Sequence, residues 1–222
     1  MMKTRRILFG ALPLLAVGQS AFAQFGGMLG GGKSSGGGGN IEADIAAFLD
    51  KSFKIEMTAS KAYLAIVAAF SSEEKRAELQ SLFNDVGKQT NPQEAGAKFQ
   101  QVRETTEAEI KRLSEEKDLG ERTKSLSAEK QQNVARGVGN LILAGLQGAD
   151  LVPTGKNIVS GVGANPMAVT KLSPLKDAMT RLQSAISLST SAMPKLVDAL
   201  RGANVSVVSV KASSTEEKIE KI

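Results

Sequence analysis

Repeated matches to the pattern Ser-x-x-Lys are the most enzyme-like feature of this 222-residue sequence. In serine acyl enzymes the pattern places a lysine beside a nucleophilic hydroxyl, and it works together with the motifs S-D-N and K-T-G. Neither companion motif occurs here. Repeated matches in a chain rich in Ser and Lys therefore indicate helix caps and surface polar pairs. Among the matches are Ser72/Lys75, Ser114/Lys117 and Ser127/Lys130.

A phosphate-binding pattern, G-x-x-x-x-G-K-[ST], is matched by residues 27–34, GMLGGGKS. Such a loop binds phosphate only between a strand and a helix, because ordered backbone amides and the helix N-terminus hold the anion. Here the match lies inside a run from Gln24 to Gly39 that has nine glycines in 16 residues. A chance match in a low-complexity segment explains it, and we predict no nucleotide site.

The sequence contains no His and no Cys. Their absence excludes Ser-His-Asp triads, nearly all zinc catalysis, thiolate metal sites and disulfide bonds. The acidic clusters Glu73/Glu74/Glu78 and Glu104/Glu107 are interleaved with Lys and Arg, as solvated helix faces are. We expect no carboxylate at a buried position where its pKa would be raised. The sequence thus predicts a protein that is not an enzyme and that has no cofactor and no metal site.

The N-terminus has the three parts of a secretory signal peptide. A basic stretch, MMKTRR, precedes an apolar run from Ile7 to Val17, and Ala21-Phe22-Ala23 provides an A-x-A cleavage site. We predict a signal peptide over residues 1–23, cleavage near Ala23, and a periplasmic or secreted mature protein. The glycine-rich residues 24–40 are then expected to form a flexible, disordered tether.

Charge and aromatic content argue against a nucleic-acid partner. The formal net charge is +5, and Lys3, Arg5 and Arg6 of the signal peptide supply three of the positive charges. The chain has no Trp and one Tyr, so it lacks the aromatic platforms on which single strands stack. We therefore predict no nucleic-acid binding.

Hydrophobic residues recur at helical spacing through most of the chain and predict an all-α fold. A first helix from about Ile41 to Phe70 has apolar residues four and three apart, the spacing of a coiled coil. Further helices are expected over about 72–88 and 92–118, and a last one begins at Ser173. Together with an apolar helix near residue 140, they predict an elongated bundle of about five helices in a single domain, residues 41–210.

Residues 134–152 form the least polar segment after the signal peptide. Their only charges are Arg136 and Asp150, which lie with Asn140 and Gln147 on one narrow stripe of a helix. A helix that is apolar over nearly its whole circumference is a buried one. We interpret the segment as the central core helix. Its candidate core or apolar interaction residues are Val138, Leu141, Ile142, Gly145, Gly148 and Ala149.

The chain after this helix is expected to lose regular structure towards its end. Pro153 should end the central helix, a loop should follow as far as Pro166, and Pro194 should kink the last helix. Residues 204–210, NVSVVSV, alternate at strand period and predict a short extended segment. This segment pairs with another copy, pairs with a target, or packs on the bundle. A polar, frayed tail, residues 211–222, completes the chain.

The exclusions leave three classes of function. The first is an exported binding or assembly module that presents a bundle face to a protein partner or to another copy of the chain. The second uses the low-charge residues 134–169 to meet a lipid or membrane surface, or to carry an apolar ligand. The third, an enzyme based on carboxylates or Ser/Lys, has the least support. We favour the first because sustained heptad spacing often pairs helices across chains.

Overall fold

The computed structural model describes residues 41–162 and 172–222. Seven helices and no strand occur in these two ranges, which confirms the predicted all-α fold. The number exceeds the expected five because a short α4 follows α3 and because the last helix divides at Ala192. The helices are α1 (Ile41–Phe70), α2 (Glu73–Gly87), α3 (Pro92–Glu115), α4 (Leu119–Ser125), α5 (Ala128–Val162), α6 (Leu172–Ser191) and α7 (Met193–Gly202).

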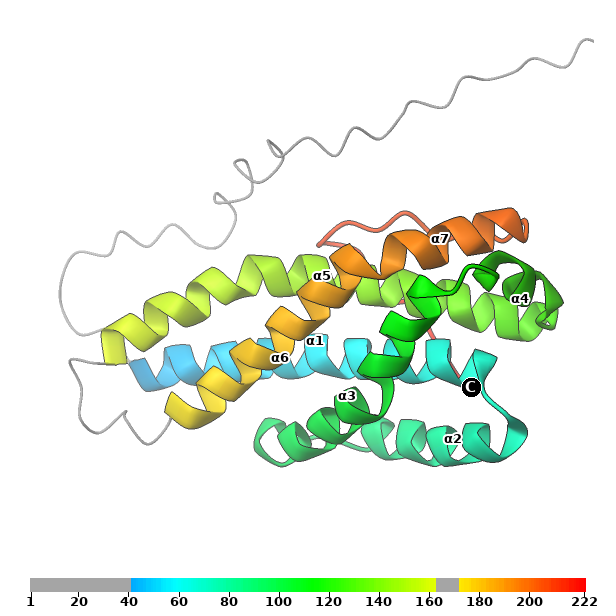
Figure 1. Ribbon diagram of the computed structural model, residues 1–222. Helices are drawn as coiled ribbons and strands as arrows, with labels where there is room; N and C mark the ends of the chain where they lie inside the picture. The colour runs from blue at the N-terminus through cyan, green and yellow to red at the C-terminus, as the bar shows by residue number, and fades with distance from the viewer. Residues whose placement is uncertain (1–40, 163–171) are drawn as a thin grey trace, which may run out of the picture. The chain divides into compact units, whose positions relative to one another are not determined.

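Helices α1 and α5 form the middle of this helical unit. Helix α5 packs most extensively against α1 and α6, while α1 also packs against α2, α3 and α6. Figure 1 shows α1 and α5 side by side along most of their length, with α6 crossing them. The apolar positions predicted to point inward from α1, among them Ile45, Phe48 and Ala59, are buried in the shared core. The heptad-spaced apolar residues of α1 therefore pack against other helices of the same chain in this structure.

Helix α5 continues past the proline that was expected to end it. Pro153 has no N–H to donate to the carbonyl four residues earlier, yet the helix runs on to Val162. Close packing explains why, since a Cβ added at Gly155 would lie only 2.7 Å from the Phe48 ring of α1. Tertiary contacts thus outweigh the tendency of proline to end a helix. The prediction of a loop after Pro153 is therefore wrong as far as Val162. The rest of that loop lies outside the described residues.

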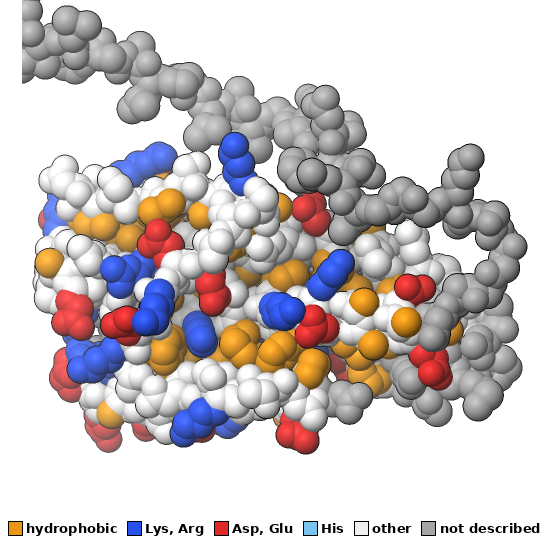
Figure 2. All heavy atoms as spheres, turned by 180° about the vertical axis from the view of Figure 1, so that it is seen from behind, with side chains coloured by type: hydrophobic (Ala, Val, Ile, Leu, Met, Phe, Trp, Pro, Cys, Tyr) orange, Lys and Arg blue, Asp and Glu red, His pale blue; other side chains and the backbone are white. Residues whose placement is uncertain are grey.

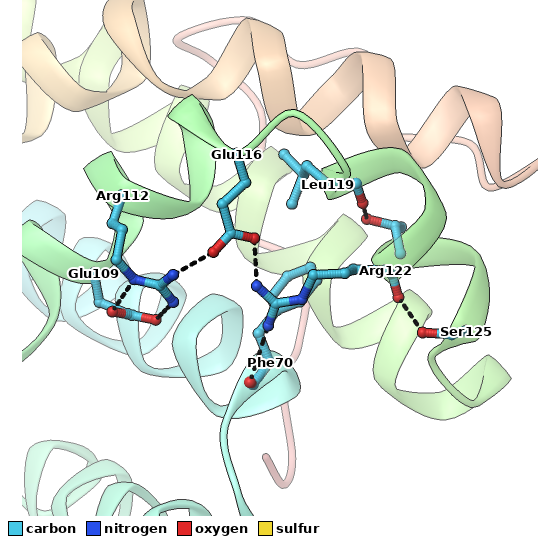
Figure 3. Close-up of polar contacts among 8 residues, drawn as sticks. Phe70, Glu109, Arg112, Glu116, Leu119, Arg122 and Ser125 are labelled. Atoms are coloured by element: carbon cyan, nitrogen blue, oxygen red, sulfur yellow. Dashed lines mark hydrogen bonds and ion pairs between the residues drawn. The ribbon is translucent and has the colours of Figure 1, made fainter.

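The end of α1 is fastened to the junction of α3 and α4 by charged side chains (Figure 3). Glu116 accepts a hydrogen bond from Arg112 on one carboxylate oxygen and from Arg122 on the other. Arg122 also lies over the Phe70 ring, 5.4 Å from its centroid, and donates to the Phe70 carbonyl oxygen at 3.5 Å. Glu109 pairs with the far side of Arg112. Both carboxylate oxygens of Glu116 have hydrogen-bond partners, so we interpret this network as a structural connection between the helices.

The surface of the bundle carries both signs of charge. Figure 2 shows Lys and Arg side chains interspersed with Asp and Glu on one face of the molecule. Pairs one helical turn apart, such as Lys111 with Glu107 and Arg76 with Glu73, contribute to this pattern. Such pairs are typical of solvated helix faces. No helix in the part of the chain that the structure describes is long and apolar enough to cross a membrane.

Candidate functional site

Four of the six candidate residues of α5 lie in the packed interior of the bundle. The two glycines among them let α6 approach, because a Cβ at Gly145 would lie 2.0 Å from Ser189 Oγ and one at Gly148 would lie 3.4 Å from Ile186 Cγ1. Their role in this structure is to hold helices together. Val138, Leu141, Gly145 and Gly148 are buried, and Ile142 and Ala149 are half-buried.

The polar stripe of α5 is covered by the C-terminal segment, residues 211–222. Asn140 binds the main chain of Glu217 at both groups: its side-chain N–H₂ donates to the carbonyl at 2.7 Å, and its side-chain oxygen accepts from the amide at 2.7 Å. Gln147 donates to the carbonyl of Ala212 at 3.0 Å. The few polar groups of this otherwise apolar helix therefore bind an extended backbone.

The last residues of the C-terminal segment are anchored as well. Asn133 of α5 donates to the Lys221 carbonyl at 2.9 Å, and Gln80 of α2 accepts from the Ile222 amide at 2.9 Å. Ile219 and Ile222 are 8 % and 6 % exposed. The expectation of a frayed tail is thus wrong, because two apolar side chains are buried and the backbone between them has partners.

Residues 204–210 link α7 to the C-terminal segment without forming a strand. Val205 and Val207 pack on the core, whereas Val208 is 53 % exposed. Asn204 begins the link with a positive φ of 60°, a conformation that Asn tolerates better than most residues. Of the three expected alternatives, an extended segment packed on the bundle describes the conformation seen here.

Glu56 of α1 is a buried carboxylate, contrary to the expectation that none would be found. It is 5 % exposed, and its Oε2 accepts from Arg181 Nε at 2.5 Å. Its Oε1 has no hydrogen-bond partner among the described residues. Burial raises the pKa of Glu56 to about 7, although the positive charges of Arg181 and Arg103 oppose the rise. The carboxylate is enclosed because both α3 and α6 pack against α1.

A small inner cavity adjoins this glutamate. It has a volume of about 20 Å³ and is lined by Glu56, Tyr63, Arg103 and Arg181, among others. That volume holds about one water molecule. The Tyr63 hydroxyl is buried and also has no hydrogen-bond partner in the described part of the chain. Burial raises the pKa of Tyr63, so its hydroxyl stays protonated and is a donor.

A larger outer cleft lies on the other side of the two arginines. It has a volume of about 540 Å³, and Arg103 and Arg181 line it as well as the inner cavity. Its wall includes residues from the first two turns of α3 and of α6, with Gly96 and Asp177 among them. The guanidinium groups of the two arginines therefore lie between an open cleft and a buried carboxylate.

The other sequence patterns have plain structural roles where the structure describes them. Ser72 and Ser127 accept a hydrogen bond from the backbone N–H of Lys75 and Lys130, which confirms the cap interpretation for these two Ser-x-x-Lys matches. Ser114 donates to a backbone carbonyl of its own helix. No group of three or more acidic residues in the described ranges is placed to hold a metal ion. The signal peptide, the tether and the phosphate-binding pattern lie outside those ranges.

The chain matches no family model, no curated protein and no solved structure.

Proposed function

We propose that this chain is an exported, non-enzymatic assembly module, in which the C-terminal segment of one copy binds to the polar stripe of α5 on another. The observation that carries the proposal is the pair of hydrogen bonds between Asn140 and the main chain of Glu217. This recognition depends on an extended backbone and not on its covalent attachment to the same bundle. A second copy brings the same segment with the same backbone groups.

The link between α7 and the C-terminal segment favours such an exchange. Residues 206–210 form no hydrogen bond to any described residue, so releasing them leaves no backbone partner behind. An extended stretch of seven residues, 204–210, reaches up to about 24 Å. The segment can therefore leave its own α5 and bind another without unfolding α7.

Attachment to the same chain gives the C-terminal segment an effective concentration in the millimolar range on its own bundle. We therefore expect exchanged dimers to increase with protein concentration and to coexist with monomers. Sedimentation velocity of the mature protein over a wide concentration range measures this distribution. A single monomeric species at every concentration contradicts the assembly proposal.

Cross-linking between two variants tests the exchange directly, because the natural chain has no cysteine. Gln147→Cys and Ala212→Cys proteins are mixed at high concentration and treated with a short bis-maleimide. We expect a cross-linked heterodimer, because Gln147 donates to the Ala212 carbonyl in the docked state. Adding Asn140→Ala to the first variant should lower the yield at least tenfold, since two hydrogen bonds of roughly 1 kcal/mol each are lost.

A matched control moves the first cysteine along the same helix. Gln132 is exposed and lies 15 residues before Gln147, which is about 22 Å along α5. The pair Gln132→Cys and Ala212→Cys should therefore give little heterodimer. Equal yields from both pairs, or no heterodimer from either, would show that the C-terminal segment is not exchanged.

Export is supported by the sequence of residues 1–23 and is tested separately. Expression of the full chain in a Gram-negative host should release a periplasmic or secreted protein that begins at Gln24. Intact-mass measurement of that protein checks the cleavage site. Retention of residues 1–23 on a cytosolic product would remove export from the proposal and leave the assembly test unaffected.

The lipid-facing and apolar-carrier alternatives gain no support from the structure. The apolar side chains of residues 134–152 are mostly buried against α1 and α6, and residues 163–169 of the low-charge stretch lie outside the described part. None of the six candidate residues of α5 lines the outer cleft or the inner cavity, and both walls include the charged side chains of Arg103 and Arg181.

A further inference from the structure

Arg181 presents two unused nitrogen atoms beside the outer cleft. Its Nε donates to Glu56, but Nη1 and Nη2 have no hydrogen-bond partner among the described residues. These two atoms lie 3.6 and 3.5 Å from the position a Cβ would take at Gly96, on the wall of the cleft. A guanidinium fork with two free N–H groups matches a carboxylate or phosphate.

Arg103 is a second cation beside the outer cleft, and most of its N–H groups have no hydrogen-bond partner among the described residues. It donates to the side-chain oxygen of Gln100, and no carboxylate in the described ranges lies within ion-pair distance of it. Arg103 and Arg181 both line the outer cleft and the inner cavity. Two guanidinium groups thus line one opening, and only that of Arg181 is paired with the buried carboxylate of Glu56.

The inner cavity supplies an independent observation. Buried polar atoms in folded proteins nearly always have a hydrogen-bond partner. Here Glu56 Oε1 and the Tyr63 hydroxyl are both buried without one, and both residues line the same cavity. The site is therefore incomplete in the chain alone, and a water or a ligand oxygen beside the arginines would complete it.

We propose that the outer cleft binds a small organic oxyanion, a carboxylate or a phosphate monoester, through Arg103 and Arg181. Its volume of about 540 Å³ falls within the range of small-molecule sites and exceeds that of a simple inorganic ion. Asp177 lines the same cleft and accepts hydrogen bonds, so a ligand that also carries a hydroxyl or ammonium group fits best. The proposal does not depend on exchange of the C-terminal segment.

Binding should be coupled to the protonation of Glu56. An oxyanion that binds Arg181 weakens the ion pair between Arg181 and Glu56. The protein with bound ligand therefore favours the protonated form of the Glu56 carboxyl group. The groups that face Glu56 and Arg181 are Tyr63 from α1, Arg103 and Glu107 from α3, and Asp177 from α6. Although burial opposes it, hydrogen bonds from Lys111 and Ser184 hold the pKa of Glu107 below its usual value, so Glu107 stays ionised near neutral pH. Affinity is therefore expected to increase as the pH falls from 8 to 6.

Calorimetric titration of the mature full chain tests the site with four probes: malate, glutamate, glycerol 3-phosphate and inorganic phosphate. We expect saturable binding of at least one organic probe, with inorganic phosphate weaker, and the carboxylate and phosphate arms separate the two ligand classes. Arg103→Gln should weaken the binding at least tenfold, because charge-assisted hydrogen bonds are lost. Arg103 has no ion pair in the described structure, so this variant leaves no stranded carboxylate.

Arg201→Gln is the matched control, because Arg201 is exposed on α7 and does not line the outer cleft. It should bind the probes as the natural chain does. With the carboxylate probes, a second variant, Glu56→Gln, should abolish the dependence of the affinity on pH. The proposal is overturned if no probe binds saturably, or if Arg103→Gln and Arg201→Gln bind equally well.

Discussion

Two carboxylates of this bundle lie between arginines, and they differ in how completely they are partnered. Glu116 is 14 % exposed, and each of its oxygens accepts from a different arginine. Glu56 is more deeply buried, and only one of its oxygens has a partner. The first pair of interactions joins helices at a junction, whereas the second leaves hydrogen-bonding capacity beside a cavity. A buried carboxylate oxygen without a hydrogen-bond partner, and not the presence of an ion pair, is what marks a candidate site.

The largest effect that distinguishes the two regions is expected from Arg181→Ala. It leaves Glu56 buried without its ion-pair partner, and removing one member of a buried pair costs about 3–5 kcal/mol of unfolding free energy. Urea denaturation measures this loss. The double variant Glu56→Leu/Arg181→Met removes both charges and should return close to the natural stability, because no buried charge is left behind. Equal destabilisation of the single and double variants would mean that the loss reflects packing alone.

A smaller effect is expected from pH. The folded-state pKa of Glu56, raised to about 7, lies above its unfolded value of 4.5. The folded protein therefore binds more protons than the unfolded chain between these values, so stability falls as the pH rises from about 4.5 to 7. The full difference is on the order of 3–4 kcal/mol, since one pKa unit corresponds to about 1.4 kcal/mol.

The variant Glu56→Gln checks this assignment. Its unfolding free energy should lose that decline between pH 4.5 and 7, whereas Glu116→Gln should leave the decline in place. If the natural chain shows the same stability at both ends of the interval, Glu56 is not the buried titrating group that its surroundings indicate.

The smallest effect is expected at the fully partnered carboxylate. Arg122→Ala removes one ion pair with Glu116 and the contact with the Phe70 ring, but Arg122 is about one-third exposed and Arg112 still binds Glu116. Partly exposed interactions of this kind contribute about 1 kcal/mol. Thermal denaturation of Arg122→Ala and Arg181→Ala, measured in parallel, compares the two losses of stability. A loss as large as that of Arg181→Ala would show that the two carboxylates are energetically alike.

Local signals in the sequence were sufficient for the fold class and for the buried helix. Periodic apolar positions predicted α1, and Ser72 does act as a helix cap. The small residues of α5 indicated close packing, and a Cβ at Gly145 would indeed collide with Ser189. The helical periodicity and the cap depend on neighbours within a few turns, and the small size of the glycines is visible in the sequence although their partner helix is not.

The features that were missed depend on distant neighbours. Pro153 remains helical because Phe48, more than 100 residues earlier, packs against the next turn. Glu56 is buried because α3 and α6 enclose α1 on two sides, and the available signal was the almost entirely apolar stretch that follows it, residues 62–70. The candidate site as a whole was not predicted, because Arg103 and Arg181 approach Glu56 only in the folded chain.

The proline inside α5 divides that long helix into two parts that need not open together. The carbonyl four residues before Pro153 has no amide to bind, so the ladder of hydrogen bonds is interrupted there. The residues after the gap pack on α1 and α6, as Gly155 does on Phe48 and Met179, whereas the residues before it are also bound by the C-terminal segment. Backbone amides after Pro153 should therefore exchange with solvent deuterium in a separate, earlier event, which makes the last turns of α5 a local opening unit within a rigid bundle.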